Sequence, residues 1–456
     1  MQRQAETDQH QERRTRIRWW IVGLAFLLTS VNYVDRANLG VALPFIREDL
    51  GLSSFQAGLV LSGFFWTYAV GQLISGYLVD RWGARIMYTF SAVWWSIFTA
   101  AAALAQGFAS LFGLRLLLGA GESPAYPCNV KATGDWFPKQ ERGLATGIYD
   151  SGARVGSALA IPLVAALIAL VGWRGSFVIT GAMGLIFAAA WGWFYRRPRQ
   201  HWMASEEEID YIEAGQDWGA DEEADRERGL EVEAEAEGAG AARIGRQSSI
   251  RWVDLLSYRA VWGMMIGNFC IAFVIYWFVT WFPSYLVDDR GFTLLSLGIY
   301  GSIPVLVAIP SGWLGGFVAD KIVGRGVSLT AARKTCIIGG LLVSTVAALS
   351  LLTESAALAL ALLSVSYGGL TFANASVWSL PSDLAPTQGH NASLAGLMNF
   401  AGNVAGIAVS TSVGALLALT GGSYVLPILT AFGFAIIGAL NYLFVIGRVA
   451  PIQARA

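Results

Sequence analysis

Five charged residues interrupt long apolar stretches of this sequence, and their types could hold an anion and exchange protons. They are Asp35, Arg36, Arg115, Glu122 and Arg154. Arginine offers a planar fork of donors that can grip a carboxylate, and a shielded carboxylic acid can take up and release a proton. At the centre of a bilayer each charge would cost about 2.5–3.5 kcal/mol if nothing compensated it. We therefore expect these side chains to face a protein interior or an aqueous cavity and to neutralise one another.

Helix geometry determines which of these charged side chains can share a partner. Asp35 and Arg36 are adjacent in the sequence, so on a helix they point about 100° apart and can serve different partners. Arg115 and Glu122 are seven residues apart and share one helix face, with Cα atoms about 10 Å apart along the axis. The residue types favour Arg36 as the anion-binding group and Asp35 and Glu122 as proton carriers. The alternative is a set of static ion pairs that holds helices together.

Arg154 has two interpretations. It contacts the second carboxylate of a diacid, or it pairs with Asp150, which lies one helical turn earlier.

Neutral polar and aromatic residues could complete a binding site for a hydroxylated anion. In the first half of the chain these are Tyr33, Asn38 and Tyr68. In the second half they are Asn268, Tyr276, Trp378, Asn399 and Asn403. The alternative for the tyrosines is helix packing. For Asn399 and Asn403, which share a helix face, the alternative is hydrogen bonding between helices.

The segments that carry these residues are predicted to be membrane-spanning helices. Of the 456 residues, 55% are hydrophobic and only 14% are charged, whereas about 25% are charged in an average soluble protein. A helical span needs about 20 apolar residues, and backbone groups in lipid require the helix. We predict about twelve spans. They cover residues 19–43, 56–79, 86–106, 108–131, 141–171, 173–195, 260–287, 293–319, 334–352, 356–380, 389–419 and 422–447.

The distribution of charge predicts the orientation and the division of the chain. Lys and Arg gather in one set of connections, which places both termini in the cytoplasm of a multi-pass protein of the cell (inner) membrane. The stretch between the two sets of spans is acidic and lacks apolar residues, so we predict a partly disordered linker with short helices at its ends. The expected units are an N-terminal tail, a six-helix bundle, the linker, a second six-helix bundle and a C-terminal tail, at 1–18, 19–197, 198–256, 257–447 and 448–456.

A short loop motif occurs at matching places in the two halves. The first copy follows the second span and contains Gly76, Asp80, Arg81, Gly83 and Arg85. The second copy follows the eighth span and contains Gly316, Asp320 and Lys321. We expect each leading glycine to let a neighbouring helix approach, and each aspartate to lie within reach of basic partners or a helix N-terminus. Two such copies predict an internal repeat, an architecture typical of secondary transporters.

Longer motifs make the sequence resemble the major facilitator superfamily, and within it the anion:cation symporter family, which includes bacterial galactonate, glucarate and hexuronate permeases and animal sialin. The segments that carry the resemblance are NYVDRANL at 32–39, FFWTY at 64–68, RLLLGAGESPAYP at 115–127, WFPKQERG at 136–143 and TWFPSYL at 280–286. The resemblance implies an all-α fold of about twelve transmembrane helices in two pseudo-symmetric six-helix bundles. It also implies alternating access.

The resemblance further implies roles for individual residues. Asp35 and Glu122 would couple transport to protons, with Arg115 modulating the second acid. Tyr33, Arg36 and Tyr68 would bind substrate in the first bundle. In the second bundle the implied substrate contacts are Ser376, Trp378 and Asn399. Galactonate permeases often carry Gln where Ala153 stands here, a departure that argues against galactonate itself.

These observations predict a proton-coupled symporter that brings a small organic anion, such as glucarate, galactonate or a hexuronate, into the cytoplasm. Aromatic carboxylates such as phthalate or hydroxyphenylacetate are the alternative substrates, and a uniporter, an exchanger or a non-transporting receptor are alternative functions. The sequence contains no phosphate-binding loop, H-E-x-x-H or G-x-S-x-G motif, and its three cysteines are far apart. We therefore expect no enzyme, cofactor or metal. A net charge of -1 gives no reason to expect nucleic acid, so the predicted partners of this monomer are the anion, protons and the lipid bilayer.

Overall fold

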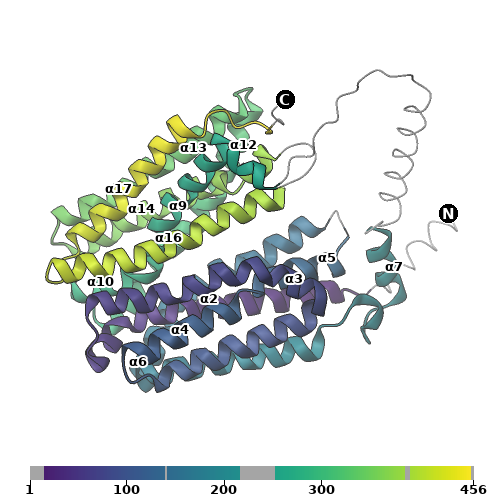
Figure 1. Cartoon of the computed structure of the whole chain (residues 1–456), viewed down its shortest axis with the longest axis horizontal. Coiled ribbons are helices and arrows are strands. Elements are labelled where there is room, and N and C mark those ends of the chain that lie inside the picture. Colours follow the sequence, from purple (N-terminus) through teal and green to yellow (C-terminus); the bar gives the residue numbers. More distant parts are fainter. Residues whose placement is uncertain (1–14, 139–140, 216–251, 386–390, 453–456) are drawn as a thin grey trace.

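The structure is a computed structural model, and it describes residues 15–138, 141–215, 252–385 and 391–452. Within these ranges the chain is helical and contains no strand. Figure 1 shows the helices in two groups, with the first half of the chain in purple to teal and the second half in green to yellow. The predicted disorder of the acidic linker concerns residues 216–251, which lie outside the described residues.

Six long helical segments build the first half. Two glycines with positive φ divide continuous helices into separate spans: Gly83 (φ 80°) and Gly172 (φ 73°). Glycine adopts this backbone conformation without a steric penalty. The helices are α2 (Ile17–Leu50), α3 (Ser54–Ala101) with η1 (Ala102–Leu104), α4 (Phe108–Glu122), α5 (Ala125–Trp136) and α6 (Arg142–Phe194), followed by η2 (Pro198–Gln200) and α7 (Glu206–Ala214).

The second half repeats this pattern with more interruptions. Its helices are η3 (Trp252–Ser257), α9 (Arg259–Thr280), α10 (Phe282–Asp288), α11 (Leu294–Tyr300), α12 (Ile303–Gly324), α13 (Leu329–Ser344), η4 (Thr345–Leu352), α14 (Ala356–Val377), α15 (Leu380–Leu384), α16 (Asn391–Leu419), α17 (Val425–Leu440) and η5 (Asn441–Val445). Nine helical segments of the described chain are long and apolar enough to cross a membrane. Because α6 is divided at Gly172, it counts as two spans. The first part of α3 and the α4–α5 pair add two more, which gives the twelve predicted spans.

The helix ends fall into two sets that differ in charge. One set, which we call the Arg-rich end, carries Arg85, Arg196 and Arg325. The other, the Arg-poor end, includes Leu50 and Asp288, where α2 and α10 finish. Described contacts between the two halves lie in the middle of the spans, as between Gln72 and Asn399, and toward the Arg-poor end, as between Arg47 and Asp288. This conformation is therefore closed at the Arg-poor end.

Small residues allow the two halves to approach closely. A Cβ added at Gly58 of α3 would lie 2.5 Å from the carbonyl oxygen of Ser410 in α16, and one at Gly414 would lie 2.6 Å from that of Ser54. One at Gly40 of α2 would lie 2.8 Å from the carbonyl oxygen of Val279. No real side chain fits at these distances, so the glycines permit contact between helix backbones.

The two leading glycines of the loop motif do not have the predicted packing role. A Cβ built on Gly76 or on Gly316 meets no atom within 4 Å. The expectation that these glycines admit a neighbouring helix is therefore wrong for this conformation, because both face open space. The close helix contacts of this fold lie at other glycines, such as Gly152 and Gly156, where α6 meets the backbone of α2.

The start of the acidic linker forms a short helix, as predicted, but this helix is fixed to the first half by a buried glutamate. Ser205 caps α7, and the first turn of this helix carries three glutamates, which the helix dipole stabilises there. Glu208 is fully buried. Its carboxylate accepts from the backbone N–H of Ile17 at 3.0 Å and from Arg18 at 3.0 Å. This part of the linker thus caps α2 and is fixed to the first half.

Candidate functional site

An ion pair between Arg36 of α2 and Glu122, the last residue of α4, lies at the centre of the first half. Both Nε and Nη2 of Arg36 contact the same oxygen, Oε1 of Glu122. The second oxygen of Glu122 is buried and has no hydrogen-bond partner among the described residues. Glu122 is fully buried, whereas the Arg36 side chain is 14% exposed. Arg36 is therefore the member of the pair that a ligand can reach.

Three aromatic rings surround the guanidinium of Arg36. Its Cζ atom lies 5.0 Å from the ring centroid of Tyr33, 4.8 Å from that of Phe64 and 4.6 Å from that of Tyr68. Phe64 and Tyr68 stack on each other at 5.0 Å. Aromatic faces attract a cation and exclude water from it. The three predicted substrate residues Tyr33, Arg36 and Tyr68 thus lie together, and Phe64 is an additional member of the cluster.

Arg115 is a second buried cation in this cluster. It is 5% exposed and its Cζ lies 5.4 Å from the ring centroid of Phe64. Arg115 forms no ion pair with any residue that the structure describes, and its buried Nε has no hydrogen-bond partner there. Glu122 pairs with Arg36 instead, as the long spacing between Arg115 and Glu122 allowed. A buried cation without a counterion is costly, so Arg115 favours a negatively charged ligand nearby.

Asp35 is not a member of this ion pair. Its carboxyl group is 1% exposed, and neither oxygen has a hydrogen-bond partner in the described chain. The neighbouring hydroxyl of Thr180 accepts from Asn38 at 3.1 Å and donates to the carbonyl of Phe177 at 3.4 Å. A carboxyl group in this setting carries charge only at a high cost in free energy. Asp35 and Arg36 therefore serve different surroundings, as their adjacency predicted.

Asn38 was predicted to bind hydroxyl groups of the substrate, but in the structure it forms hydrogen bonds between two helices. Its amide nitrogen donates to Thr180 at 3.1 Å and its oxygen accepts from Ser176 at 3.1 Å. Asn38 is fully buried between α2 and α6. Both ends of the amide are used, so Asn38 holds two helices together and does not face a ligand.

The second half supplies the opposite wall. Tyr276 of α9 packs on Phe65 of α3, with ring centroids 4.7 Å apart, and it interacts electrostatically with Tyr33, Arg36 and Tyr68. Asn399 of α16 donates to Gln72 at 3.0 Å. The structure thus brings Tyr276 to the Arg36 cluster and places Asn399 at the contact between the halves.

Gln72 is a polar residue that the sequence reasoning missed. Its Oε1 accepts from Asn399 at 3.0 Å and from Asn403 at 3.2 Å, which links α3 to α16. Gln72 follows Tyr68 by one helical turn and so shares its helix face. A polar side chain in an apolar span, four residues from a candidate ligand, was the signal that could have identified it.

Four other predicted contacts lie apart from the Arg36 cluster. Ser376 is fully buried beside Cys336, and Asn268 donates to the carbonyl of Met398 at 2.7 Å. Trp378 is half-exposed. Arg154 forms an ion pair with Asp150 at 3.2 Å, the second of the two predicted arrangements, and its side chain is more than half exposed.

The aspartates of the loop motif have basic partners, and its basic residues contact a hydroxyl, an aromatic ring or a backbone carbonyl. Asp80 lies 3.6 Å from Lys131, and Asp320 lies 3.8 Å from Arg333, so each aspartate has a basic partner within reach. Arg81 donates to the hydroxyl of Tyr77 and Lys321 lies over the ring of Phe317. Arg85 binds the carbonyl of Gly192.

We expect Gln72→Leu to weaken substrate binding. Leucine has a similar volume but removes the acceptor of two hydrogen bonds between the halves, each worth about 1 kcal/mol. Uptake assays should show an apparent KM raised about five- to ten-fold. Thr67→Val is the matched control, because Thr67 donates to Leu116 at 2.6 Å within the first half. An equal rise of KM in both variants would contradict a role of Gln72 at the contact between the halves.

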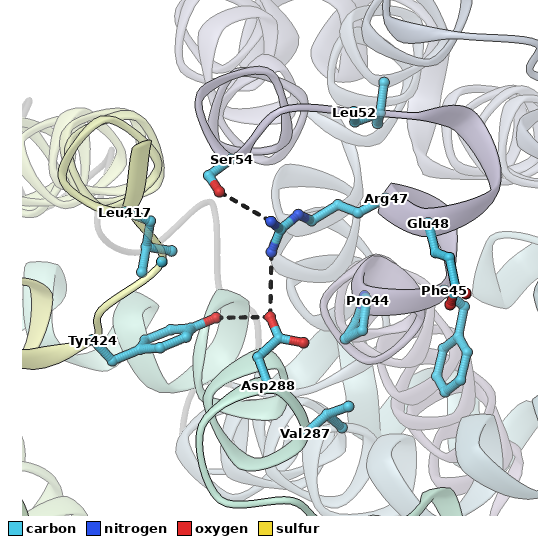
Figure 2. A pocket seen from close by; sticks show the side chains of 11 residues that line it. Pro44, Phe45, Arg47, Glu48, Leu52, Ser54, Val287, Asp288, Leu417 and Tyr424 are labelled. Carbon is cyan, nitrogen blue, oxygen red and sulfur yellow. Dashed lines mark hydrogen bonds and ion pairs between the residues drawn. The ribbon is translucent and has the colours of Figure 1, made fainter. Parts of the chain in front are cut away.

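A cavity of about 560 Å³ with a mixed polar and apolar lining lies at the Arg-poor end, between the halves and away from Arg36. Figure 2 shows Arg47 of α2 reaching across it to Asp288 of α10. These side chains form an ion pair at 3.2 Å. Asp288 also accepts from the hydroxyl of Tyr424 at 3.2 Å, and Arg47 donates to Ser54 at 3.0 Å. Burial raises the pKa of Asp288, an effect that Arg47 opposes. These interactions connect both halves at the closed end.

We expect Asp288→Ala to open this end more often. A partly exposed ion pair contributes up to about 1 kcal/mol, so a cysteine introduced at Leu52, which lines the cavity, should react about three- to five-fold faster with a membrane-impermeant maleimide. The three native cysteines are buried. Asp49→Ala is the control, because its partner Arg174 belongs to the same half. Equal labelling in the Asp288 and Asp49 variants would contradict a closing role for the Arg47–Asp288 pair.

Comparisons with known proteins agree with this arrangement. The family model described as Major Facilitator Superfamily matches residues 25–411. A probable galactarate/D-glucarate transporter of Bacillus subtilis is 35% identical over 96% of this chain and 93% of its own length. A D-galactonate transporter of Escherichia coli O6:H1 is 36% identical over 95% of this chain and 96% of its own length.

A solved structure has a similar fold. It is that of a bacterial homolog to the human lysosomal transporter Spinster, in an inward-facing and unoccupied conformation. The TM-score is 0.72 at 19% identity, over 94% of this chain and 96% of that one. The family match also bears out the expectation of a transporter rather than an enzyme. The chain is a multi-pass membrane protein and belongs to the major facilitator superfamily.

Proposed function

We propose that this protein is a proton-coupled symporter of sugar acids such as glucarate, galactarate or galactonate. The observation that carries the proposal is Arg36, a partly exposed cation within three aromatic rings, paired with the buried acid Glu122. A carboxylate of the substrate can replace Glu122 at this guanidinium. The names of the B. subtilis and E. coli relatives support sugar acids as the class.

Charge balance links protons to substrate. Asp35 and Glu122 are buried acids, and Arg36 and Arg115 are buried or nearly buried cations. When both acids are protonated, the site holds two positive charges, which match the two carboxylates of an aldarate. When both acids are ionised, the site is neutral and the attraction for an anion is lost. Substrate and protons are therefore bound together and released together.

Neutral polar side chains near Arg36 would bind the hydroxyl groups of the sugar acid. Tyr33, Tyr68 and Tyr276 offer phenolic hydroxyls near Arg36. The amides of Gln72 and Asn399 stand at the contact between the halves. Such groups both donate and accept, as a chain of secondary alcohols requires. This polar surface favours sugar acids over aromatic carboxylates.

The direction of transport follows from the charge distribution. The positive-inside rule places the Arg-rich end and both termini in the cytoplasm. The Arg47–Asp288 side then faces outward and is closed. In this orientation the closed end is the outer one, as expected of the state that releases substrate to the cytoplasm during import.

The test is uptake of labelled D-glucarate into proteoliposomes with an imposed inward proton gradient. We expect accumulation above the external concentration, and collapse of accumulation by a protonophore. Unlabelled galactarate and galactonate should compete, whereas phthalate and 4-hydroxyphenylacetate should not. Liposomes that contain the Glu122→Gln variant are the matched control and should not respond to the gradient.

Other outcomes identify the competing functions. Uptake only into liposomes preloaded with an organic anion would indicate an exchanger. Thermal stabilisation by glucarate without any uptake would indicate a receptor. Competition by phthalate but not by galactarate would replace sugar acids with aromatic carboxylates.

A further inference from the structure

Two arginines of the first half converge on one backbone carbonyl at the Arg-rich end. Arg85 follows the break at Gly83 and donates to the carbonyl oxygen of Gly192 through Nε at 3.0 Å and Nη2 at 2.9 Å. Arg196 follows the end of α6 and donates to the same oxygen through Nη1 at 3.0 Å. The start of the third span and the end of the sixth span thus bring two guanidinium groups around a single acceptor.

This pair of cations has no counterion in the described part of the chain. The other acceptors of Arg196 are the carbonyls of Trp193 and Tyr195, both at 2.8 Å. Neither Arg85 nor Arg196 forms an ion pair with a described residue, although nearby aspartates such as Asp80 pair elsewhere. Two like charges this close repel each other. An anion that contacts both would remove the repulsion and form charge-assisted hydrogen bonds.

Exposed tryptophans surround the two arginines. Trp193 is 65% exposed and contacts Trp202 at a ring-centroid distance of 5.4 Å. The guanidinium of Arg196 lies over the Trp202 ring at 5.5 Å. Trp82, three residues before Arg85, is half-exposed. Tryptophan concentrates at the headgroup level of membranes, so these rings place the arginine pair at that depth.

An apolar stripe runs from the arginine pair along the third span. Ile86 and Phe90 are four residues apart in the helix that follows the break at Gly83 and so share a face, whereas Trp82 lies just before that break. Ile86 is 63% exposed and Phe90 is 52% exposed. The surface therefore offers a cationic head and an apolar track that leads toward the middle of the span, which are the two features of a phospholipid.

We propose that Arg85 and Arg196 bind the phosphate of an anionic phospholipid whose acyl chain lies along Ile86 and Phe90. The apolar stripe favours a lipid over a free phosphate ion, because a free ion has no acyl chain that could contact the stripe. The bound lipid would join the turn between the second and third spans to the end of the sixth. This surface lies outside the Arg36 cluster, so the proposal does not depend on which substrate is carried.

The test is native mass spectrometry of the full chain in a neutral detergent, titrated with phosphatidylglycerol or with phosphatidylcholine of the same acyl chains. The intact protein should retain phosphatidylglycerol in preference. Arg85→Gln and Arg196→Gln should each lower its apparent affinity about five-fold. Arg325→Gln is the control, because Arg325 is exposed at the same end of the other half. That control should bind as the unchanged protein does.

Two further measurements are needed. One guards against a variant that loses lipid only because it fails to fold, and the other tests whether a free phosphate ion binds in place of the lipid. Arg85→Lys keeps the charge and should retain most of the preference for phosphatidylglycerol. The melting temperature of the unchanged protein should rise more with phosphatidylglycerol than with inorganic phosphate. Equal retention of both lipids, an equal loss in Arg325→Gln, or equal stabilisation by inorganic phosphate would each overturn the proposal.

Discussion

Arg36→Gln is expected to abolish uptake and to destabilise the protein at the same time. The substitution removes the cation that faces the ligand and leaves Glu122 buried with no partner. Breaking a buried ion pair on one side costs about 3–5 kcal/mol. Losing a charged ligand contact of this kind costs at least about 2–5 kcal/mol, so initial uptake rates should fall by more than about 30-fold.

A double variant separates these two effects. Arg36→Gln combined with Glu122→Gln removes both charges and leaves two amides that can bond each other. The melting temperature should recover relative to the single Arg36 variant, because no buried charge is left unpaired. Uptake and thermal stabilisation by glucarate should remain absent. If the double variant regained uptake, Arg36 would be a structural residue and the proposed site would be wrong.

Arg36→Lys addresses the geometry of the contact. Lysine keeps the positive charge but lacks the planar fork that can bind a carboxylate through two hydrogen bonds. The variant should remain as stable as the unchanged protein, since Glu122 still has a cationic partner. Its apparent KM for glucarate should nevertheless rise about ten-fold or more. An unchanged KM would indicate that Arg36 attracts the substrate only by its charge.

The sequence identified the central residues because charge in an apolar span is so costly. Asp35, Arg115 and Glu122 stand out for that reason, and all three are buried. Which charges would pair was harder to predict, because the partners belong to different helices. Arg36 reaches Glu122 across 86 positions of the chain. That pairing depends on how α2 and α4 pack against each other. The sequence periodicity of either helix does not determine this packing.

Neutral polar residues were predicted less well for a related physical reason. An asparagine in a span can face a ligand or another helix at similar cost, since either partner satisfies its amide. Asn38 binds the neighbouring helix α6, whereas Asn399 meets Gln72 at the contact between the halves. The error at Gly76 and Gly316 is similar. A glycine permits a close contact but does not require one.

Glycine breaks were predicted best, since backbone conformation alone decides them. The expected boundary between the spans at 141–171 and 173–195 coincides with Gly172, whose φ is 73°. Only glycine adopts this conformation readily. Here the residue type determines the structure locally and no distant contact is needed. The linker was predicted less well: Glu208 was read as part of an acidic, solvated stretch, but it is buried against α2.

Asp35→Asn is expected to uncouple transport from the proton gradient while leaving substrate exchange intact. Asparagine has nearly the same shape and resembles the protonated acid. In the structure neither oxygen of Asp35 has a partner among the described residues, so no hydrogen bond is lost. The variant should therefore keep a melting temperature close to that of the unchanged protein. It should also still be stabilised by glucarate, because Arg36 remains in place.

Two transport assays test this separation. In counterflow, where labelled glucarate exchanges for unlabelled glucarate, the variant should work at a rate within a few-fold of the unchanged protein. Under an inward proton gradient without internal substrate, accumulation should be lost, because the carrier no longer releases a proton from this site. Asp49→Asn is the matched control on the same helix, since Asp49 pairs with Arg174 at the Arg-poor end. That control should retain gradient-driven accumulation.

The pattern across the two assays decides the role of Asp35. Loss of both counterflow and gradient-driven uptake would make Asp35 a substrate ligand or a structural residue. Retention of both would leave Glu122 as the sole proton carrier. Glu122 differs from Asp35 in having a cationic partner, Arg36. Proton binding at Glu122 therefore competes with that ion pair, whereas at Asp35 it removes the cost of a buried charge. The two acids therefore have separate roles. Asp35 couples transport to protons, and protonation of Glu122 frees Arg36 to bind the anion.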